Sequence, residues 1–328
     1  MKTRTEEIAQ AAKAAVEAAL WAPSIHNTQP WSFGVSGDEI SLRADPDRKL
    51  RVSDPTGRQL MISCGAALFN VRITLLALGY EPEVRRIPDP ERPLLLATVR
   101  VRPGQEPGEH VRLLHGEIER RRTHRSGFTA LPVPDRLIDA LVAEATAEGG
   151  HMTPIRSDAS ARVLAALTGA AQDVQSQNRL FVLELMRWAR PPGSSRRDGV
   201  PAAGYPTDPR RTYPQHFAQR DYARGHEWGM APDERVSAST GLVALLSTAG
   251  DSREDWLRAG EALQRMLLHA SAYGLSVAFH TQALEMPELR EFIRRHLCSD
   301  EPPQMIMRLG FVIDESESVR RAPSEVLE

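Results

Sequence analysis

The sequence contains little cysteine and almost no net charge, and each shortage excludes a class of protein. Cys64 and Cys298 are its only cysteines, which leaves no disulfide framework and fits a reducing cytosol. The 41 lysines and arginines nearly balance 43 aspartates and glutamates, so no overall field attracts nucleic acid or acidic lipid. Apolar runs of about 18 residues, which a membrane-spanning helix needs, are missing, and the helical N-terminus lacks the apolar region of a signal peptide. We therefore expect a cytoplasmic protein that binds neither nucleic acid nor a membrane.

Several common catalytic signatures are also missing. The glycine-rich pattern of Rossmann folds, the nucleophile elbow of hydrolases and the phosphate loop of NTPases do not occur. No two histidines have the spacing of helical metal ligands beside a carboxylate, so we expect no metal site. What remains is an ordinary globular composition, 41% hydrophobic and 26% charged over 328 residues, which is long enough for two structural units.

Hydrophobic periodicity predicts helices interspersed with short strands, an α+β protein. Seven prolines between Pro191 and Pro232 exclude a continuous element from residues 190–235. The helices are expected at residues 8–20, 56–78, 111–122, 135–147, 159–189, 256–273 and 286–297, and the strands at 31–35, 40–44, 94–101 and 305–312.

One internal repeat stands out. "GAALFNVRITLLALGY" (residues 65–80) aligns without gaps on "GEALQRMLLHASAYGL" (residues 260–275), and a β-rich segment follows each copy. Two amphipathic helices can match this well by chance. As a duplication, however, the repeat divides the chain into units at residues 1–104 and 105–328, a homodimer folded into one polypeptide. The identical pairs are Gly65/Gly260, Ala67/Ala262, Leu68/Leu263, Ala77/Ala272 and Gly79/Gly274.

Two polar segments are the best candidates for a binding site. "WAPSIHNTQPWSF" (residues 21–33) combines two prolines and two tryptophans with serine, histidine, asparagine and glutamine. Its prolines stiffen the backbone and hold the polar groups in place, although a proline-rich loop anchored by tryptophans is the plainer interpretation. "RRTHR" (residues 121–125) clusters guanidinium groups that suit a phosphate, although arginines also favour a solvated helix end.

These motifs resemble those of the nitroreductase superfamily. "APSIHNTQPW" is similar to the family pattern A-P-S-x-x-N-x-Q-P-W, and "RRTHRSGF" is similar to R-R-S-x-R-x-F, with Thr123 for serine and one extra residue before Phe128. "MPELREFI" (residues 286–293) resembles the family's P-x-x-L-R-x-x-L helix, and a strand ending in Leu-Gly-Phe and paired arginines follow it. The resemblance covers most of the chain except residues 190–235. The order of the motifs is similar to that of the Acg-type NAD(P)H nitroreductases of actinobacteria.

The resemblance implies two tandem nitroreductase-like units, each a mixed or antiparallel sheet surrounded by helices, that form an intrachain pseudo-dimer and a monomer in solution. It implies one FMN per chain, because a second composite site would lack both the P-S-x-x-N segment and the basic elbow (residues 121–125). Hydride would pass from NAD(P)H through FMN to a quinone or nitroaromatic acceptor, with no catalytic side chain. The implied cofactor-binding residues are Pro23, Ser24, His26, Asn27, Gln29, Arg121, Arg122, Thr123, Arg125, Thr281, Gln282, Arg320 and Arg321.

Residues 190–235 point to an alternative function. This lid-like insertion is rich in aromatic residues, and long loops of this kind often cover active sites. If it covers the flavin, the protein is a low-turnover FMN-binding protein for flavin storage or redox sensing. A duplicated scaffold that has lost its cofactor is the third possibility. His26, His124 and His280 could be acid–base groups or buried structural histidines. The aromatic residues of the insertion are Tyr205, Tyr213, Phe217, Tyr222 and Trp228.

Overall fold

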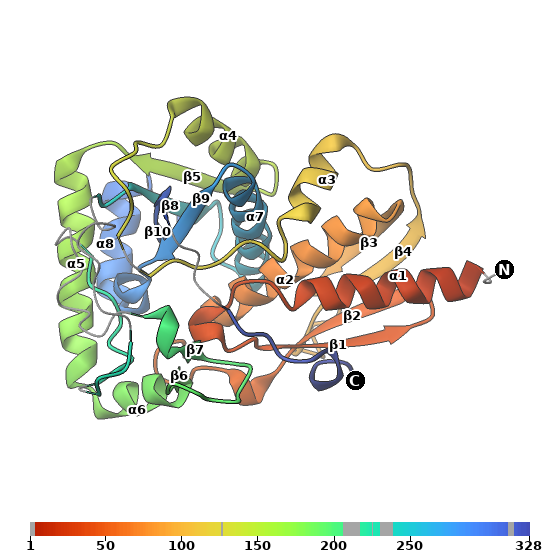
Figure 1. The fold of residues 1–328 in the computed structure, drawn as a ribbon, viewed down its shortest axis with the longest axis horizontal. Coiled ribbons are helices and arrows are strands. Elements are labelled where there is room, and N and C mark those ends of the chain that lie inside the picture. Colours follow the sequence, from red (N-terminus) through yellow and green to blue (C-terminus); the bar gives the residue numbers. More distant parts are fainter. Residues whose placement is uncertain (1–3, 126, 206–216, 225, 230–238, 314–317) are drawn as a thin grey trace.

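The protein contains two antiparallel four-stranded sheets, one in each half of the chain (Figure 1). The computed structural model describes residues 4–125, 127–205, 217–224, 226–229, 239–313 and 318–328. The first sheet has the order β1-β2-β4-β3 and the second has the order β5-β8-β10-β9. The strands are β1 (Trp31–Ser36), β2 (Glu39–Ala44), β3 (Tyr80–Arg86), β4 (Leu95–Pro103), β5 (Gly150–Ile155), β8 (Leu242–Thr248), β9 (Leu275–Phe279) and β10 (Pro303–Phe311), with β6 (Ala189–Arg190) and β7 (Val200–Pro201) as a separate short parallel pair.

Helices pack on both sheets and connect them. A 3-10 turn, η1 (Ile25–Asn27), follows the first helix, and another, η5 (Gln282–Glu285), follows β9. The helices are α1 (Arg4–Ala19), α2 (Arg58–Ala77), α3 (Glu109–Gly116), α4 (Asp135–Thr146), α5 (Asp158–Gln177), α6 (Arg179–Trp188), α7 (Arg253–Ala272) and α8 (Pro287–Leu297). The structure thus has the α+β architecture that the sequence predicted.

The two sheets share one topology. In each, two strands precede a long helix and two strands follow it, and the four strands pair in the same spatial order. Helices α2 and α7 both contain 20 residues, and α7 starts 195 positions after α2 (253 − 58), the offset that aligns Gly260 with Gly65. Gly79 and Gly274 follow the two helices with φ of 83° and 75°, a left-handed conformation that favours glycine.

The equivalent glycines Gly65 and Gly260 meet where α2 crosses α7. A Cβ atom on Gly65 would lie 2.0 Å from the carbonyl oxygen of Leu257, and one on Gly260 would lie 2.0 Å from that of Ile62. Contact between equivalent residues is what a two-fold interface between identical subunits produces. This crossing supports the predicted duplication.

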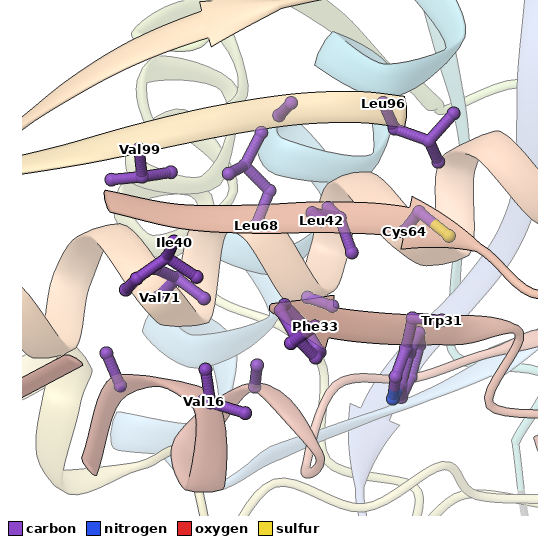
Figure 2. Close-up of a cluster of buried hydrophobic side chains, with 14 of the residues drawn as sticks. Val16, Trp31, Phe33, Ile40, Leu42, Cys64, Leu68, Val71, Leu96 and Val99 are labelled. Carbon is purple, nitrogen blue, oxygen red and sulfur yellow. The ribbon is translucent and has the colours of Figure 1, made fainter. Parts of the chain in front are cut away.

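Helix α2 is the central helix of the core. By length and composition it could cross a membrane, but 83% of its most apolar window is buried inside the protein. It packs with α1 against the first sheet, where Trp31, Phe33 and Leu42 are fully enclosed (Figure 2). Burial on all sides explains why its sequence is almost continuously apolar.

The structure differs from the sequence prediction at several elements. Strands β3, β5, β8 and β9 were not predicted. The helix expected at residues 159–189 breaks at Asn178, whose side-chain oxygen accepts hydrogen bonds from the backbone N–H groups of Leu180 and Phe181. The segment without a counterpart in the first unit spans residues 156–241, because it joins β5 to β8 where Gly37 and Asp38 alone join β1 to β2. It includes the predicted insertion and two helices besides.

Candidate functional site

A cavity lies where η1, the basic elbow, the start of η5 and the insertion meet. It encloses about 750 Å³ of empty space, part of it open to solvent. A smaller hollow of about 350 Å³ adjoins it and shares four of its lining residues, among them Ser24 and Arg125. The larger cavity is lined by Pro23, Ser24, Ile25, His26, Gln59, Ile62, Ser63, Thr123, Arg125, Gln219, Arg220, Tyr222, Leu263, Phe279, Thr281 and Met305.

The structure brings most of the predicted site residues to these two cavities. Gln29, Arg121, Arg122, Gln282 and Arg321 line neither. The predicted residues that line at least one are Pro23, Ser24, His26, Asn27, Thr123, Arg125, Thr281 and Arg320.

The segment after α1 enters the cavity in a strained conformation. His26, Asn27 and Gln29 have φ of 48°, 53° and 50°, a left-handed region that costs a non-glycine residue about 1–3 kcal/mol. Local hydrogen bonds hold the strain, since the Gln29 N–H donates to Ser24 Oγ at 2.9 Å and the Ile25 N–H donates to Ser63 Oγ at 3.2 Å. Strain that is held in this way is typical of a ligand-binding segment.

Asn27 and Gln29 tie three distant segments together. Asn27 Nδ2 donates to the Gly199 carbonyl at 2.9 Å, and its Oδ1 accepts from Arg320 Nη1 at 3.2 Å. Gln29 Oε1 accepts from the Arg321 N–H at 2.8 Å. These contacts join the N-terminal motif to the insertion and to the C-terminal arginines. Gln29 and Arg321 therefore build the site without facing it.

The basic elbow and the C-terminal segment form a cluster of arginines, and few negative charges among the described residues offset its positive charge. Burial, followed by the charges of Arg122 and Arg125, lowers the pKa of Arg121 to about 9. Burial also holds the pKa of Arg320 well below its usual value, and the charges of Arg121, Arg122 and Arg125 lower it further. In the described part of the chain, Arg121, Arg125 and Arg320 form no ion pair, and the Nε atoms of Arg121 and Arg320 have no hydrogen-bond partner. Buried like charges of this kind need an anion.

The insertion supplies a second group of polar side chains. The Tyr222 hydroxyl lies 2.7 Å from His26 Nδ1, and both residues are buried. Burial lowers the pKa of His26, with Arg220 and Arg125 adding to the effect, while burial raises the pKa of Tyr222. Both groups are consequently neutral near pH 7.

Arg220 is held by a buried carboxylate. It pairs with Glu285, which also accepts hydrogen bonds from Gln59 Nε2 and Gln175 Nε2 at 2.9 Å each. Its Nη1 atom has no partner among the described residues. Arg220 is thus a fixed cation at the cavity with donor capacity left over.

The other predicted residues have structural contacts. Gln282 Nε2 donates to the Ala218 carbonyl at 3.0 Å. His280 contacts the same carbonyl through Nδ1 and accepts from Arg308 Nε through Nε2 at 2.8 Å. His124 Nε2 lies 2.7 Å from the Gly127 carbonyl, and burial lowers its pKa to about 4. His280 and His124 line neither cavity, which favours the structural interpretation for both.

Sequence reasoning missed the contribution of α2. Gln59 and Ser63 line the cavity, one turn apart on a helix that is otherwise apolar there, and that polar pair was the available signal. Of the insertion's aromatic residues, Tyr222 lines the cavity, whereas Tyr205 and Phe217 are buried elsewhere and Trp228 packs partly buried beside Tyr205 and Tyr222. Tyr213 lies outside the described residues.

Comparisons with known proteins come from sequence and from structure. No family model matches the chain. A Mycobacterium tuberculosis protein provisionally named an NAD(P)H nitroreductase is 34% identical over 328 residues, covering 98% of this chain and 92% of the relative. The M. tuberculosis protein acg, provisionally given the same activity, is 29% identical over 317 residues, covering 95% of this chain and 92% of the relative.

Three solved structures align with about two thirds of the chain or more. An FMN-bound nitroreductase from Desulfitobacterium hafniense aligns with a TM-score of 0.40 and 11% identity, over 67% of this chain and 97% of that one. NfnB from Mycobacterium smegmatis, an FMN-dependent nitroreductase solved with NADPH, aligns with a TM-score of 0.40 and 16% identity, over 66% and 97%. An Anabaena variabilis protein aligns with a TM-score of 0.45 and 13% identity, over 92% and 73%.

Proposed function

The chain belongs to the Acg-type nitroreductase family, and on that premise we propose that it is an FMN-dependent NAD(P)H oxidoreductase. The observation that carries the proposal is the arginine cluster beside the cavity. Arg121, Arg125 and Arg320 have no carboxylate partner among the described residues. All three are buried, and burial lowers the pKa of each guanidinium group. A protein that buries cations in this way gains stability only when an anion joins them.

The smaller hollow fits the phosphate of FMN. Arg125 and Arg320 line it together with Ser24, Asn27 and Thr123, which add hydroxyl and amide groups. Arginine forks bind phosphate through charge-assisted and often bidentate hydrogen bonds. Arg121 and Arg122 do not line the hollow, but their charges act on Arg320 and add to the positive potential there.

The larger cavity fits the ring. Apolar side chains form part of its wall, and a few fixed polar groups face the same space, the combination expected of a cofactor site. When bound, FMN supplies the two-electron transfer between a nicotinamide and an acceptor. The protein binds and orients it, places the Arg220 charge nearby, and keeps the neutral His26–Tyr222 pair at the cavity wall. The apolar wall residues include Pro23, Ile62, Leu263, Phe279 and Met305.

The proposed substrates are NAD(P)H and a quinone or nitroaromatic acceptor, since a cavity open to solvent admits flat aromatic molecules. We also propose that the protein acts in the cytoplasm as a monomer. The contact between Gly65 and Gly260 supports the monomer, because the chain already contains the interface that a dimer would form.

A low-turnover flavin-binding protein is the second candidate, and one observation favours it. Tyr222 and Arg220 come from the insertion and line the cavity, so this segment covers part of the proposed ring site. A side chain over the ring would exclude the nicotinamide.

Mixing FMN-loaded protein with NADPH without oxygen separates these functions. Rapid bleaching of the visible flavin absorption supports the oxidoreductase. Bound flavin that does not bleach supports storage or sensing. A colourless protein that binds no added FMN rejects both and leaves a scaffold without its cofactor.

A further inference from the structure

Three side chains that are far apart in the sequence meet outside the proposed flavin site. His110 lies in α3, Glu144 in α4 and His269 in α7, and their ligand atoms all lie within 4.8 Å of one another. Helix α7 contacts both α3 and α4 (Figure 1). None of the three residues lines either cavity.

The distances in this cluster suit a transition metal. Glu144 Oε1 lies 3.0 Å from His110 Nε2 and 3.3 Å from His269 Nδ1. Tetrahedral Zn²⁺, with bonds of about 2.0–2.2 Å to nitrogen and oxygen, places neighbouring ligand atoms about 3.3–3.5 Å apart. Two histidines and one carboxylate are also a common ligand set for this metal. All three ligand atoms lie within 4.8 Å of one another, so the side chains must move closer together to bind it.

His269 has a buried ring nitrogen with an unused hydrogen-bonding capacity among the described residues. The residue is 8% exposed, and its Nδ1 atom has no hydrogen-bond partner among the described residues. The atom faces Glu144 Oε1 at 3.3 Å without the geometry of a hydrogen bond. A buried ring nitrogen beside a carboxylate oxygen is an arrangement that can hold a cation between the two atoms.

Arg265 fixes the carboxylate from the other side. Its Nε atom donates to Glu144 Oε2 at 2.6 Å, which leaves Oε1 for the two histidines. Carboxylates that bind metals are usually held by such an outer hydrogen bond. The opposing interpretation is a plain ion-pair network, in which Arg265 also contacts Glu148 Oε1 at 3.2 Å.

We propose that His110, Glu144 and His269 bind one divalent transition metal, with Zn²⁺ the best fit. His110 is exposed and gives the ion access from solvent, and water completes its coordination. The bound metal links α3 to α4 and α7. Helix α3 leads into the basic elbow, so the link anchors the segment that carries Arg121 and Arg125.

The test is titration of the full-length, chelator-treated, FMN-loaded protein with ZnCl₂ by calorimetry, and with CoCl₂ by visible absorption. We expect one Zn²⁺ per chain and the strong visible bands of four-coordinate Co²⁺. His110→Ala and Glu144→Gln should each weaken binding at least about 10-fold. Circular dichroism of both variants checks that they fold.

His151→Ala is the matched control. His151 is an exposed histidine whose Nδ1 lies 2.6 Å from Glu301 Oε1, but no second histidine joins this pair among the described residues. Its removal should leave Zn²⁺ binding unchanged. No saturable binding to the wild type, or equal binding by His110→Ala and the wild type, overturns the proposal.

Discussion

At the scale of the residue, the site depends on arginine charges that no carboxylate among the described residues neutralises. Sequence motifs could predict which arginines gather, because "RRTHR" and the C-terminal pair are visible in the sequence. They could not predict which of them face the cavity. Arg125 and Arg320 line it, whereas Arg321 is turned toward Gln29 and Trp31 by hydrogen bonds to their carbonyl groups. Those contacts depend on how the C-terminal segment packs.

Arg125→Ala should weaken FMN binding about 10- to 100-fold, because one charge-assisted contact is worth about 1.5–3 kcal/mol. Riboflavin, which lacks the phosphate, should bind the variant and the wild type equally. Arg120→Ala is the control, since its side chain is 75% exposed and lines neither cavity. Fluorescence titration measures the affinity of the wild type, Arg125→Ala and Arg120→Ala for FMN, and that of the wild type and Arg125→Ala for riboflavin. Unchanged FMN affinity in Arg125→Ala would show that the elbow does not bind the phosphate.

Three buried histidines predict a loss of stability in mild acid. Burial holds the pKa values of His26, His124 and His280 below their usual value, so the unfolded chain binds more protons than the folded one below pH 6.5. Each histidine then contributes stability that is present above about pH 6.5 and is lost as the pH falls. At pH 5.5 the loss is about 1.4 kcal/mol per histidine, or about 4 kcal/mol in all.

Urea unfolding at pH 7.5 and pH 5.5 measures this loss. His124→Gln should reduce it by about 1.4 kcal/mol, because one of the three groups no longer titrates. Equal free energies of unfolding at the two pH values would contradict the burial of these histidines.

At the scale of the element, periodicity predicted most of the helices and missed four strands of the two four-stranded sheets, as well as the short pair β6 and β7. β3 alternates charged exposed residues with partly buried ones, but Pro82 lies in its middle and argues against a strand, and β9 is short. Both are stabilised by pairing with β4 and β10, which local sequence does not report. The aligned glycines of α2 and α7 were visible in the sequence. Their contact with each other could be expected only if the duplication was assumed.

Gly65→Ala should destabilise the protein by about 3 kcal/mol, at the upper end of the usual cost of overpacking. The added Cβ would lie 2.0 Å from a backbone oxygen, so the two helices must separate. Gly169→Ala is the control, because nothing lies within 4 Å of a Cβ at this helical position. It should be neutral or stabilising by about 0.5–1 kcal/mol. Urea unfolding that ranks the two variants in the opposite order would refute the close crossing.

The insertion makes a prediction of its own. If Tyr222 covers the ring, Tyr222→Ala should speed reduction of the bound flavin by NADPH in anaerobic stopped flow, whereas Tyr222→Phe should keep the cover and the slow rate. The aromatic ring provides the cover and the hydroxyl provides the contact with His26, so the two variants separate these roles. Equal rates in Tyr222→Ala and the wild type would show that this side chain does not gate the flavin.

At the scale of the whole molecule, the two sheets and the crossing of α2 and α7 support the interpretation that one chain folds as an intrachain pseudo-dimer. Each half has one sheet, yet the described cavity draws its residues from both halves. The first half supplies η1 and part of α2, and the second supplies Thr123, Arg125 and Thr281. This division could be predicted from the order of the motifs. The contribution of the insertion could not be predicted, because the positions of Arg220 and Tyr222 at the cavity depend on how that segment folds.

The central claim is a single composite FMN site in each chain. The most direct measurement saturates the protein with FMN, removes the excess by gel filtration and compares the flavin absorbance with the protein concentration. The account predicts one flavin per chain, since η1 and the basic elbow each occur once. Two flavins per chain, or none, would contradict it.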